Sequence, residues 1–403
     1  MNVSISSGVA KGKVCAPPSK CMAHRYLIAA TLSGEGSEIS NVAFSKDIEA
    51  TLNCLKSLGA EFNISDDVVK VLKGIEPKDN IVLDCNESGS TLRFFIPIAL
   101  SFGKDITFVG SQRLFERPLD IYENICEKEG LIFSKGKSSL KVNGILNGGE
   151  YKIPGDISSQ FITGLIFALS LKKCESRITL TSHLQSKPYI DLTIDALKTF
   201  GVDVLEEKDS YVINHSSYKP QKVRIEGDYS NAAFFEALNY LGSEVKVEDL
   251  NPKSLQGDKV YLEYFKKLKE GYSVLDISNC PDLAPVLMVV AAANNGAKLI
   301  GTNRLKIKES DRGMAMQKEL EKFGCSIEIG DDYIIIPKSE LKAPNELLKS
   351  HNDHRIVMAF SVLGTKFGCE IEDAQAIDKS MPDFFQRLKS LNIEVIENGT
   401  NKK

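Results

Sequence analysis

The chain has 403 residues, a formal net charge of −4 and a hydrophobic fraction of 42%, which is typical of a globular protein that needs more than one core. Acidic and basic residues are interspersed, so the sequence lacks the basic footprint of a nucleic-acid-binding protein. Nine cysteines without a CxxC pair, no signal-peptide core and no apolar run longer than 283–293 predict a cytoplasmic protein with reduced thiols and no membrane partner.

The first predicted series of elements consists of amphipathic helices, each with a lysine two or three residues before its end. The expected ends are Gly59, Gly130, Gly201, Gly271, Gly324 and Asn392, at spacings of 71, 71, 70, 53 and 68 residues, and the lysines are Lys56, Lys128, Lys198, Lys269, Lys322 and Lys389. Gly and Asn adopt the left-handed conformation at low cost, and lysine interacts favourably with the negative end of a helix. The chain is therefore predicted to contain six repeats.

A second series of helices begins at clusters of capping residues. The clusters occupy 18–20, 88–91, 157–159, 228–230, 280–282 and 352–354. The helices that follow, such as 161–171 and 283–293, are apolar on most sides, so they are expected to be buried. Strand-like runs at 68–72, 140–142, 211–213 and 333–336 close the repeats. The fold class is predicted to be α/β, built from α+β repeats with sheet outside and helix inside.

Three repeats in each of two domains fit this length. The N-terminal lobe is predicted to span 19–226, and the C-terminal lobe to combine 227–403 with 1–18, where Val3 to Ile5 is strand-like. The chain would cross between lobes near Pro17-Pro18 and near Glu226-Gly227. The fourth repeat is short by about one strand and its loop.

Several helix starts carry cations where the helix dipole is already positive. Lys20, Arg25, Arg93, His354 and Arg355 lie at such starts, and each cation there costs a few tenths to ~1 kcal/mol. Each one alone also fits a solvated helix face or an ordinary cap. Their recurrence at equivalent starts favours anion-binding sites, because helix N-termini offer free N–H groups.

Two further charged clusters are expected between helices. One is 116–118, in a loop after the strand-like run 106–109, and the other is 308–312, which precedes the fifth amphipathic helix. The second cluster places a carboxylate among cations, which suits a site that holds an anion and moves a proton. The sequence has no GxxxxGK[ST], GxGxxG or HExxH motif, so any phosphate would be held in another way.

At these residues the chain resembles the 5-enolpyruvylshikimate-3-phosphate synthase family over nearly its whole length. The motifs that carry the resemblance are PSKCMAHR at 18–25, SGSTLR at 88–93, ERP at 116–118, SSQF at 158–161, SKPYID at 186–191, KESDR at 308–312, NDHR at 352–355 and KSMPDF at 379–384. The resemblance implies a monomer with a two-domain inside-out α/β barrel and three βαβαββ-type repeats per domain. It also implies that the helix N-termini face a cleft. From the crossings near Pro17-Pro18 and Glu226-Gly227 we expect substrate to draw the lobes together.

The activity implied by the resemblance is transfer of the enolpyruvyl (1-carboxyvinyl) group of phosphoenolpyruvate to the 5-hydroxyl of shikimate 3-phosphate. Phosphate is released by addition and then elimination, in the shikimate pathway to chorismate and aromatic amino acids. The resemblance implies neither a metal nor another cofactor.

The family's site residues carry over motif by motif. On the shikimate 3-phosphate side they are Lys20, Cys21, Arg25, Ser158, Ser159, Gln160, Ser186, Tyr189, Asp282 and Lys308. On the phosphoenolpyruvate side they are Lys20, Gly89, Arg93, Arg117, Gln160, Arg312, His354, Arg355 and Lys379. The implied catalytic residues are Asp282 as base at the hydroxyl, Glu309 as proton shuttle at C3, and Lys20 in support of either step. The division of these roles between the two steps stays open.

The sequence departs from the family pattern at three positions, with Cys21, Ser90 and Phe94 where Ser, Thr or Ala, and Pro are usual. These changes bear on the pocket shape and on glyphosate sensitivity. One alternative is UDP-N-acetylglucosamine enolpyruvyl transferase, whose mobile loop carries a reactive Cys that 110–117 lacks. Another is an inactive binding protein of the same fold, which is disfavoured by the retained Lys20, Asp282, Glu309 and Arg355.

Overall fold

The computed structural model describes residues 1–399 and divides into two compact units. Unit 1 combines Met1–Pro17 with the chain from Gly227 onward, and unit 2 is Pro18–Glu226. Within unit 1 the amide N–H of Asp228 donates to the Pro17 carbonyl at 2.7 Å, and within unit 2 the N–H of Ser19 donates to the Glu226 carbonyl at 2.8 Å. Each unit has a hydrophobic core drawn from its own residues.

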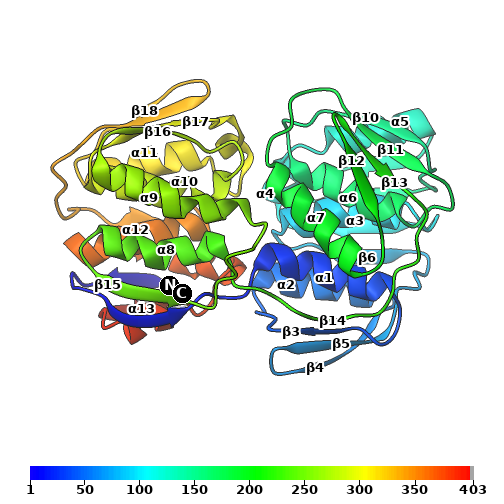
Figure 1. Ribbon diagram of the computed structural model, residues 1–403, viewed down its shortest axis with the longest axis horizontal. Coiled ribbons are helices and arrows are strands. Elements are labelled where there is room, and N and C mark those ends of the chain that lie inside the picture. Colours follow the sequence, from blue (N-terminus) through cyan, green and yellow to red (C-terminus); the bar gives the residue numbers. More distant parts are fainter. Residues whose placement is uncertain (400–403) are drawn as a thin grey trace. The chain divides into compact units, whose positions relative to one another are not determined.

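Unit 2 is built from three βαβαββ repeats (Figure 1). The first contains α1 (Lys20–Leu32), β3 (Glu38–Ser40), α2 (Lys46–Ser57), β4 (Glu61–Ser65) and β5 (Val68–Lys73), with β14 (Lys222–Arg224) as its first strand. The second contains β6 (Ile81–Asp84), α3 (Gly89–Ala99), β7 (Ile106–Val109), α4 (Gln112–Glu116), α5 (Asp120–Glu129), β8 (Ile132–Lys135) and β9 (Ser139–Asn143). The third contains β10 (Glu150–Ile153), α6 (Ser159–Leu169), β11 (Ser176–Leu180), α7 (Lys187–Thr199), β12 (Val204–Glu207) and β13 (Ser210–Ile213).

Each repeat of unit 2 forms one open sheet. The orders are β14-β3-β5-β4, β6-β7-β9-β8 and β10-β11-β13-β12. In each sheet the first two strands are parallel, and the last two form an antiparallel hairpin. A helix connects the parallel strands of the second and third sheets. The two-domain α/β class is therefore confirmed. The sheets of residues 1–399 stay separate, and none closes into a hydrogen-bonded barrel.

Unit 1 repeats the same pattern with two exceptions. The fifth repeat contains β16 (Ser273–Asp276), α10 (Ala284–Ala293), β17 (Ala297–Ile300), α11 (Arg312–Lys322), β18 (Glu328–Ile329) and β19 (Tyr333–Ile336). The sixth repeat contains β20 (Leu348–Lys349), α12 (His354–Phe367), β21 (Cys369–Glu372), α13 (Phe384–Ser390) and β22 (Val395–Asn398). β1 (Asn2–Ile5) lies between β21 and β22, with Val3 opposite both Ile371 and Glu397. The chain's first strand thus completes the last repeat.

The fourth repeat lacks its final hairpin altogether. It contains β2 (Lys11–Cys15), α8 (Tyr229–Tyr240), β15 (Glu244–Glu248) and α9 (Tyr261–Glu270), and β15 pairs only with β2 in a two-stranded sheet over residues 1–399. The expected loss of about one strand was too small. The first half of this sheet comes from the N-terminal segment.

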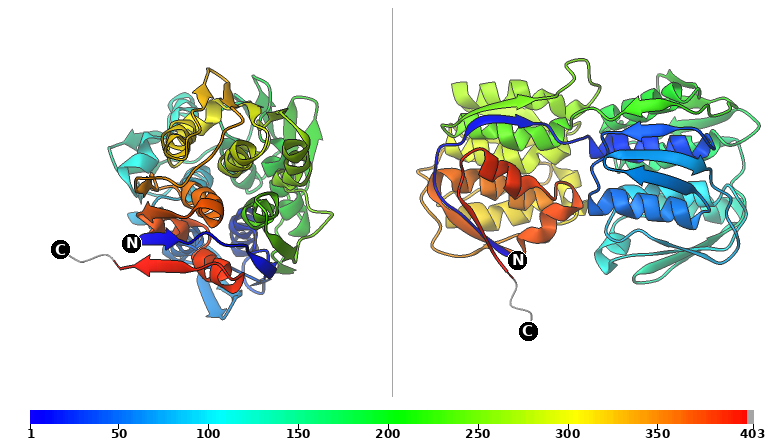
Figure 2. Two further views of the ribbon diagram at one scale, coloured as in Figure 1. Left: turned by 90° about the vertical axis from the view of Figure 1, so that its left-hand side faces the viewer. Right: turned by 90° about the horizontal axis from the view of Figure 1, so that it is seen from below.

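The apolar helices are buried, as their composition predicts. In α10 every residue except the last is buried, and α1, α3, α6, α8 and α12 are buried on most sides. The left panel of Figure 2 looks along the helices of unit 1 and shows strands around them. Helix thus lies inside and sheet outside, because these helices have no polar face to present to water.

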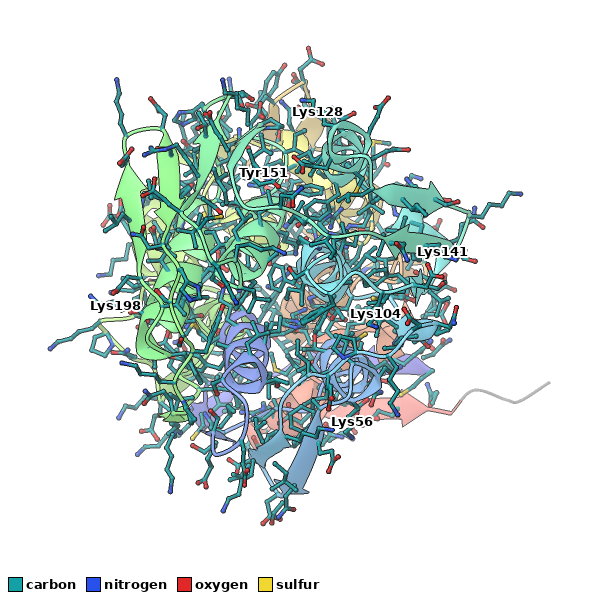
Figure 3. All side chains as sticks on the ribbon, turned by 90° about the vertical axis from the view of Figure 1, so that its right-hand side faces the viewer. Lys56, Lys104, Lys128, Lys141, Tyr151 and Lys198 are labelled. Atoms are coloured by element: carbon teal, nitrogen blue, oxygen red, sulfur yellow. The ribbon has the colours of Figure 1, made fainter. Side chains whose placement is uncertain are left out.

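Five of the six predicted helix ends are left-handed. Gly59, Gly130, Gly201, Gly324 and Asn392 have φ between 65° and 96°. Gly271 is the exception, with an extended φ of 176°. Lysines lie in the last turns as predicted, and Lys56, Lys128 and Lys198 are labelled on the outer surface of unit 2 in Figure 3.

Candidate functional site

The candidate residues of unit 2 cluster at helix N-termini. Ser19, Ser88 and Ser158 cap α1, α3 and α6, and their hydroxyls accept hydrogen bonds from backbone N–H groups at 3.5, 3.2 and 3.3 Å. These caps were predicted, because serine satisfies a free N–H group at a helix start. Ser186 differs, since it precedes α7 in a left-handed conformation with φ of 57° and makes no side-chain cap.

Lys20 pairs with a carboxylate that the sequence analysis did not single out. Its Nζ lies 2.8 Å from Oδ2 of Asp47, and the two side chains are only 15% and 13% exposed. Asp47 lies in the first turn of α2, where an acid also complements the helix dipole. Its place in an acidic first turn looks ordinary in sequence, so only the packing of α1 against α2 reveals the pair.

Arg25 links α1 to α7. Its guanidinium donates to the carbonyls of Cys21 and Tyr189 at 2.7 and 2.8 Å, and Nε donates to Thr193 at 2.9 Å. The Phe94 ring lies 5.4 Å from the guanidinium carbon. Arg25 therefore holds the predicted residues Cys21 and Tyr189 close together.

Arg93, Gln160 and Ser90 join α3 to α6. Arg93 donates to the Gln160 side-chain oxygen at 2.9 Å and to the Pro118 carbonyl at 3.0 Å, and the Gln160 amide donates to Ser90 at 3.0 Å. Ser159 is buried beside them at the start of α6. Ser90, one of the three departures from the family pattern, thus accepts a hydrogen bond from the predicted substrate-binding residue Gln160.

Arg117 approaches the start of α3. A Cβ on Gly89 would lie 2.5 Å from Nη1 of Arg117, so the glycine makes room for this guanidinium. Glu116, expected in a loop, ends the short helix α4, and Arg117 follows as its C-cap.

A chain of hydrogen bonds connects α1 and α2 to the first turn of α3. His24 Nδ1 lies 2.8 Å from Oγ1 of Thr51, which lies 2.8 Å from Oγ1 of Thr91, and Thr91 donates to Ser88 at 2.7 Å. Burial lowers the pKa of His24 well below its usual value, and the charges of Lys20 and Arg25 add to this. A neutral imidazole therefore keeps α1 in register with α2 and α3.

In unit 1 three cations converge on Asp282. Its Oδ1 accepts from Lys308 Nζ at 3.1 Å and from Arg312 Nη1 at 2.8 Å, and its Oδ2 accepts from Arg355 Nη2 at 3.1 Å. Asp282 lies in a 3-10 turn, Pro281–Leu283, which replaces the side-chain cap expected at the start of α10. This turn directs the carboxylate toward the starts of α11 and α12.

Arg312 binds three carboxylates. Beyond Asp282, its Nη2 lies 2.8 Å from Oε2 of Glu309 and its Nε lies 2.9 Å from Oδ2 of Asp353. Asp353 also caps α12 by accepting the Arg355 N–H at 2.9 Å. Asp353 lies in a predicted capping cluster, and the structure gives it a second role as an anchor for Arg312.

The remaining predicted residues of unit 1 belong to the same region. His354 is buried as the first residue of α12, and Lys379 Nζ donates to the Asn352 carbonyl at 2.5 Å. Lys379 ends a 3-10 turn, Ala374–Lys379. Unit 1 therefore brings together the residues predicted for it: Asp282, Lys308, Glu309, Arg312, His354, Arg355 and Lys379.

The neighbours of these groups set their charge states. Burial alone would raise the pKa of Asp282, but the charges of Arg355, Lys308 and Arg312 lower it well below its usual value. Burial lowers the pKa of Lys308. Asp282 is thus ionised, and the cluster can stabilise anions while a lysine with a reduced pKa lies within hydrogen-bonding distance.

Asp258 is a buried acid that the sequence analysis missed. It lies in the 3-10 turn Gly257–Val260 and accepts a hydrogen bond from the Ser230 hydroxyl. Burial, and secondarily the charge of Asp282, raise its pKa to about 6. No sequence pattern marks it, since its environment is created by α8 and the turn around Asp282.

The side chains and helices of residues 1–399 also bear on metal and membrane sites. No group of three or more His, Cys, Asp and Glu side chains there has a geometry that could hold a metal ion. No helix in this range is both long and apolar enough to cross a bilayer.

Comparisons with known proteins agree on one family. Residues 6–388 match the family described as EPSP synthase (3-phosphoshikimate 1-carboxyvinyltransferase). The 3-phosphoshikimate 1-carboxyvinyltransferases of Clostridium botulinum (strain Eklund 17B / Type B) and Clostridium perfringens (strain SM101 / Type A) are 40% and 41% identical, and the matches cover 96% and 97% of this chain and 96% and 98% of theirs.

Solved structures share the fold. EPSP synthase from Acinetobacter baumannii superposes with a TM-score of 0.79 at 21% identity, covering 98% of this chain and 100% of the other. The enolpyruvyl transferase NikO from Streptomyces tendae superposes with a TM-score of 0.77 at 11% identity, covering 98% of each chain. At these identities the likeness concerns the fold alone.

Proposed function

Because this chain belongs to the EPSP synthase (3-phosphoshikimate 1-carboxyvinyltransferase) family, we propose that it transfers the enolpyruvyl group of phosphoenolpyruvate to the 5-hydroxyl of shikimate 3-phosphate. Phosphate is the second product, and the reaction serves the pathway to chorismate and aromatic amino acids. The observation that carries the proposal is the convergence of Lys308, Arg312 and Arg355 on Asp282, beside Glu309.

The chemistry needs cations for two phosphorylated acids and carboxylates for proton transfer. Arginine forks match phosphate and carboxylate, and a hydrogen bond to a charged group contributes ~1.5–3 kcal/mol. In this proposal unit 2 supplies the shikimate 3-phosphate side, with Lys20, Arg25 and Tyr189. Unit 1 supplies the catalytic carboxylates and part of the phosphoenolpyruvate side.

Proton transfer is assigned to three groups. Asp282 removes the proton of the 5-hydroxyl while the hydroxyl oxygen adds to C2 of phosphoenolpyruvate. Glu309 delivers a proton to C3 in this step and removes a proton from C3 when phosphate leaves. Lys20 supports either step. In the structure three cations hold the pKa of Asp282 low, and anionic substrates that engage these cations would reduce this effect. Substrate binding would thereby make Asp282 a stronger base.

Phosphate release from phosphoenolpyruvate tests the function. We expect release with shikimate 3-phosphate and none with UDP-N-acetylglucosamine as acceptor. Release only with UDP-N-acetylglucosamine would indicate a UDP-N-acetylglucosamine enolpyruvyl transferase instead. Release with neither would contradict both and leave a binding protein of this fold.

We also propose a cytoplasmic monomer that needs no metal or other cofactor. All nine cysteines lie within residues 1–399 and carry free thiols, which supports a reducing compartment. Sedimentation of the purified protein at several concentrations would reveal a dimer if the monomer assignment is wrong.

A further inference from the structure

Glu319 is a buried carboxylate that the proposed reaction does not use. It lies on α11 with its side chain 1% exposed. Its oxygens pair with Nε2 of His351 at 2.7 Å and Nζ of Lys322 at 2.8 Å, and accept the backbone N–H of Lys349 at 3.0 Å. Burial alone would raise the pKa of Glu319, but these partners lower it below the usual value. The carboxylate is therefore ionised, and His351 donates to it through Nε2.

Helix α11 holds the segment 347–353 through three of its residues. Its first residue, Arg312, binds Asp353 at 2.9 Å. Glu319 follows seven residues later, which is two turns along the same face of the helix, and it binds Lys349 and His351. Lys322, one turn further, donates to the Leu347 carbonyl at 2.8 Å. One helix face thus fixes both ends of this segment.

The segment needs such anchors because its backbone is strained. His351 and Asn352 are consecutive residues with left-handed φ values of 50° and 52°. Asn adopts this conformation at low cost, but His351 has a larger side chain and needs its surroundings to hold it there. Ser350 also helps, since its hydroxyl accepts the Asn352 N–H at 3.2 Å and its carbonyl accepts the Asp353 N–H at 3.0 Å.

The strained turn leads directly into the proposed site. The Asn352 carbonyl receives Lys379 Nζ at 2.5 Å. Asp353 caps α12, whose first two residues are His354 and Arg355. The positions of three residues assigned to phosphoenolpyruvate therefore depend on the conformation of residues 351 and 352.

We propose that Glu319 is a positioning residue which, through His351 and Lys349, sets the turn that orients His354, Arg355 and Lys379 toward phosphoenolpyruvate. This inference rests on the proposed function. It differs from a purely structural role in one respect: loss of the Glu319–His351 bond should affect phosphoenolpyruvate and spare shikimate 3-phosphate.

The experiment compares Glu319→Ala with Glu321→Ala, an exposed glutamate on the same helix. For Glu319→Ala we expect the KM for phosphoenolpyruvate to rise about tenfold, as for one lost charged hydrogen bond, with the KM for shikimate 3-phosphate within about twofold of the parent. Glu321→Ala should leave both constants unchanged. If Glu319→Ala and Glu321→Ala have the same KM for phosphoenolpyruvate, the proposal is overturned.

A second pair of variants guards against a Glu319→Ala protein that does not fold. His351→Gln keeps an N–H donor for Glu319 and His351→Ala removes it, while both place an ordinary residue at the same left-handed position. We expect His351→Gln to stay near the parent and His351→Ala to show the raised KM for phosphoenolpyruvate. A lower kcat in His351→Ala with both KM values unchanged indicates a smaller folded fraction, and this overturns the positioning role.

The two proposals fail in different ways. A parent protein that releases no phosphate overturns the proposed function and this inference with it. An active parent whose His351→Gln and His351→Ala variants share the same KM for phosphoenolpyruvate overturns the inference alone.

Discussion

The carboxylates of unit 1 differ in charge state because they differ in neighbours. Asp282 lies among Lys308, Arg312 and Arg355, and its pKa falls well below the usual value despite burial. Asp353 is also buried, and Arg312 keeps its pKa low. Burial, and secondarily the charge of Asp282, raise the pKa of Asp258 to about 6, although its carboxylate accepts a hydrogen bond from Ser230. The same residue type thus serves as a fixed charge and as a titrating group.

Asp258 should make the protein less stable above about pH 6. Its carboxyl ionises near 3.8 in an unfolded chain and near 6 in the folded protein. The stabilising protonated form is therefore complete below the first value and is lost as the pH rises through the second. We expect Asp258→Asn to raise the free energy of unfolding at about pH 8 by up to about 3 kcal/mol, with the gain fading toward about pH 4.

Urea unfolding of both proteins across this pH range measures the effect. Asp331→Asn, at an exposed aspartate, is the control and should follow the parent at every pH. A difference between Asp258→Asn and the parent that stays constant with pH would contradict the raised pKa.

The assigned proton-transfer groups predict a separation of turnover from binding. Asp282→Asn and Glu309→Gln keep the size of each side chain but remove its basicity. We expect each to lower kcat by roughly 10²–10⁴-fold, the usual contribution of a general acid or base, while calorimetric binding of shikimate 3-phosphate stays within about threefold of the parent. Near-parental kcat in both variants would remove these residues from the chemistry.

At the scale of elements, the site of each unit is assembled from helix starts. Caps satisfy some of the free N–H groups, and side chains from neighbouring helices cross-link the rest of the region. Cations at a helix start are unfavourable in isolation. Here Lys20 forms an ion pair with Asp47, and Arg312 forms ion pairs with three carboxylates. These ion pairs offset the repulsion between each cation and the positive end of its helix before substrate binds.

Gly89→Ala should damage phosphoenolpyruvate binding without damaging the fold. The added methyl would lie 2.5 Å from Nη1 of Arg117, and a flexible guanidinium can move away where a backbone cannot. Alanine also favours a helix more than glycine does. We expect the thermal midpoint to stay at or above that of the parent and the KM for phosphoenolpyruvate to rise roughly 10–100-fold, as for one displaced charged hydrogen bond.

Gly271→Ala provides the matched control. A Cβ at Gly271 would have no neighbour within 4 Å, and its backbone is extended. Both kinetic constants should therefore match the parent. A parental KM in Gly89→Ala would show that Arg117 is not held at the start of α3 for phosphoenolpyruvate.

At the scale of the whole molecule, the two units have separate cores. The core of unit 1 contains Val3 and Ile5 from β1 together with residues from 229 onward, and the core of unit 2 lies within residues 22–225. Since β1 lies between β21 and β22, unit 1 cannot complete its last sheet without the N-terminal segment. Unit 2 needs no strand from elsewhere in the chain.

This separation predicts two unfolding transitions. We expect the fragment 18–226 to fold alone and to show one cooperative transition in calorimetry, matching one of two in the full chain. The fragment 227–403, which lacks β1 and β2, should show none. A single transition in the full chain together with an unfolded 18–226 fragment would mean that the units depend on each other for stability.

Local features could be predicted because they depend on residues that are close together in the sequence. Capping serines, helix-end lysines and most left-handed glycines follow from the backbone chemistry of a single helix, so the repeats could be predicted. Gly271 failed as a left-handed end, since its backbone is extended with φ of 176°. The 3-10 turn at Asp282 was also missed, because its direction depends on partners from α11 and α12.

The sequence by itself determined the repeat layout, the burial of the apolar helices and, through ordered motifs, the family. Only the tertiary structure decided which charges become partners: Lys20 with Asp47, Asp282 with three cations, and Glu319 with His351. The physical reason is range. Helix propensity, capping and hydrophobic periodicity act within a few residues, whereas ion pairs, pKa shifts and strained turns depend on groups that packing brings together from distant parts of the chain.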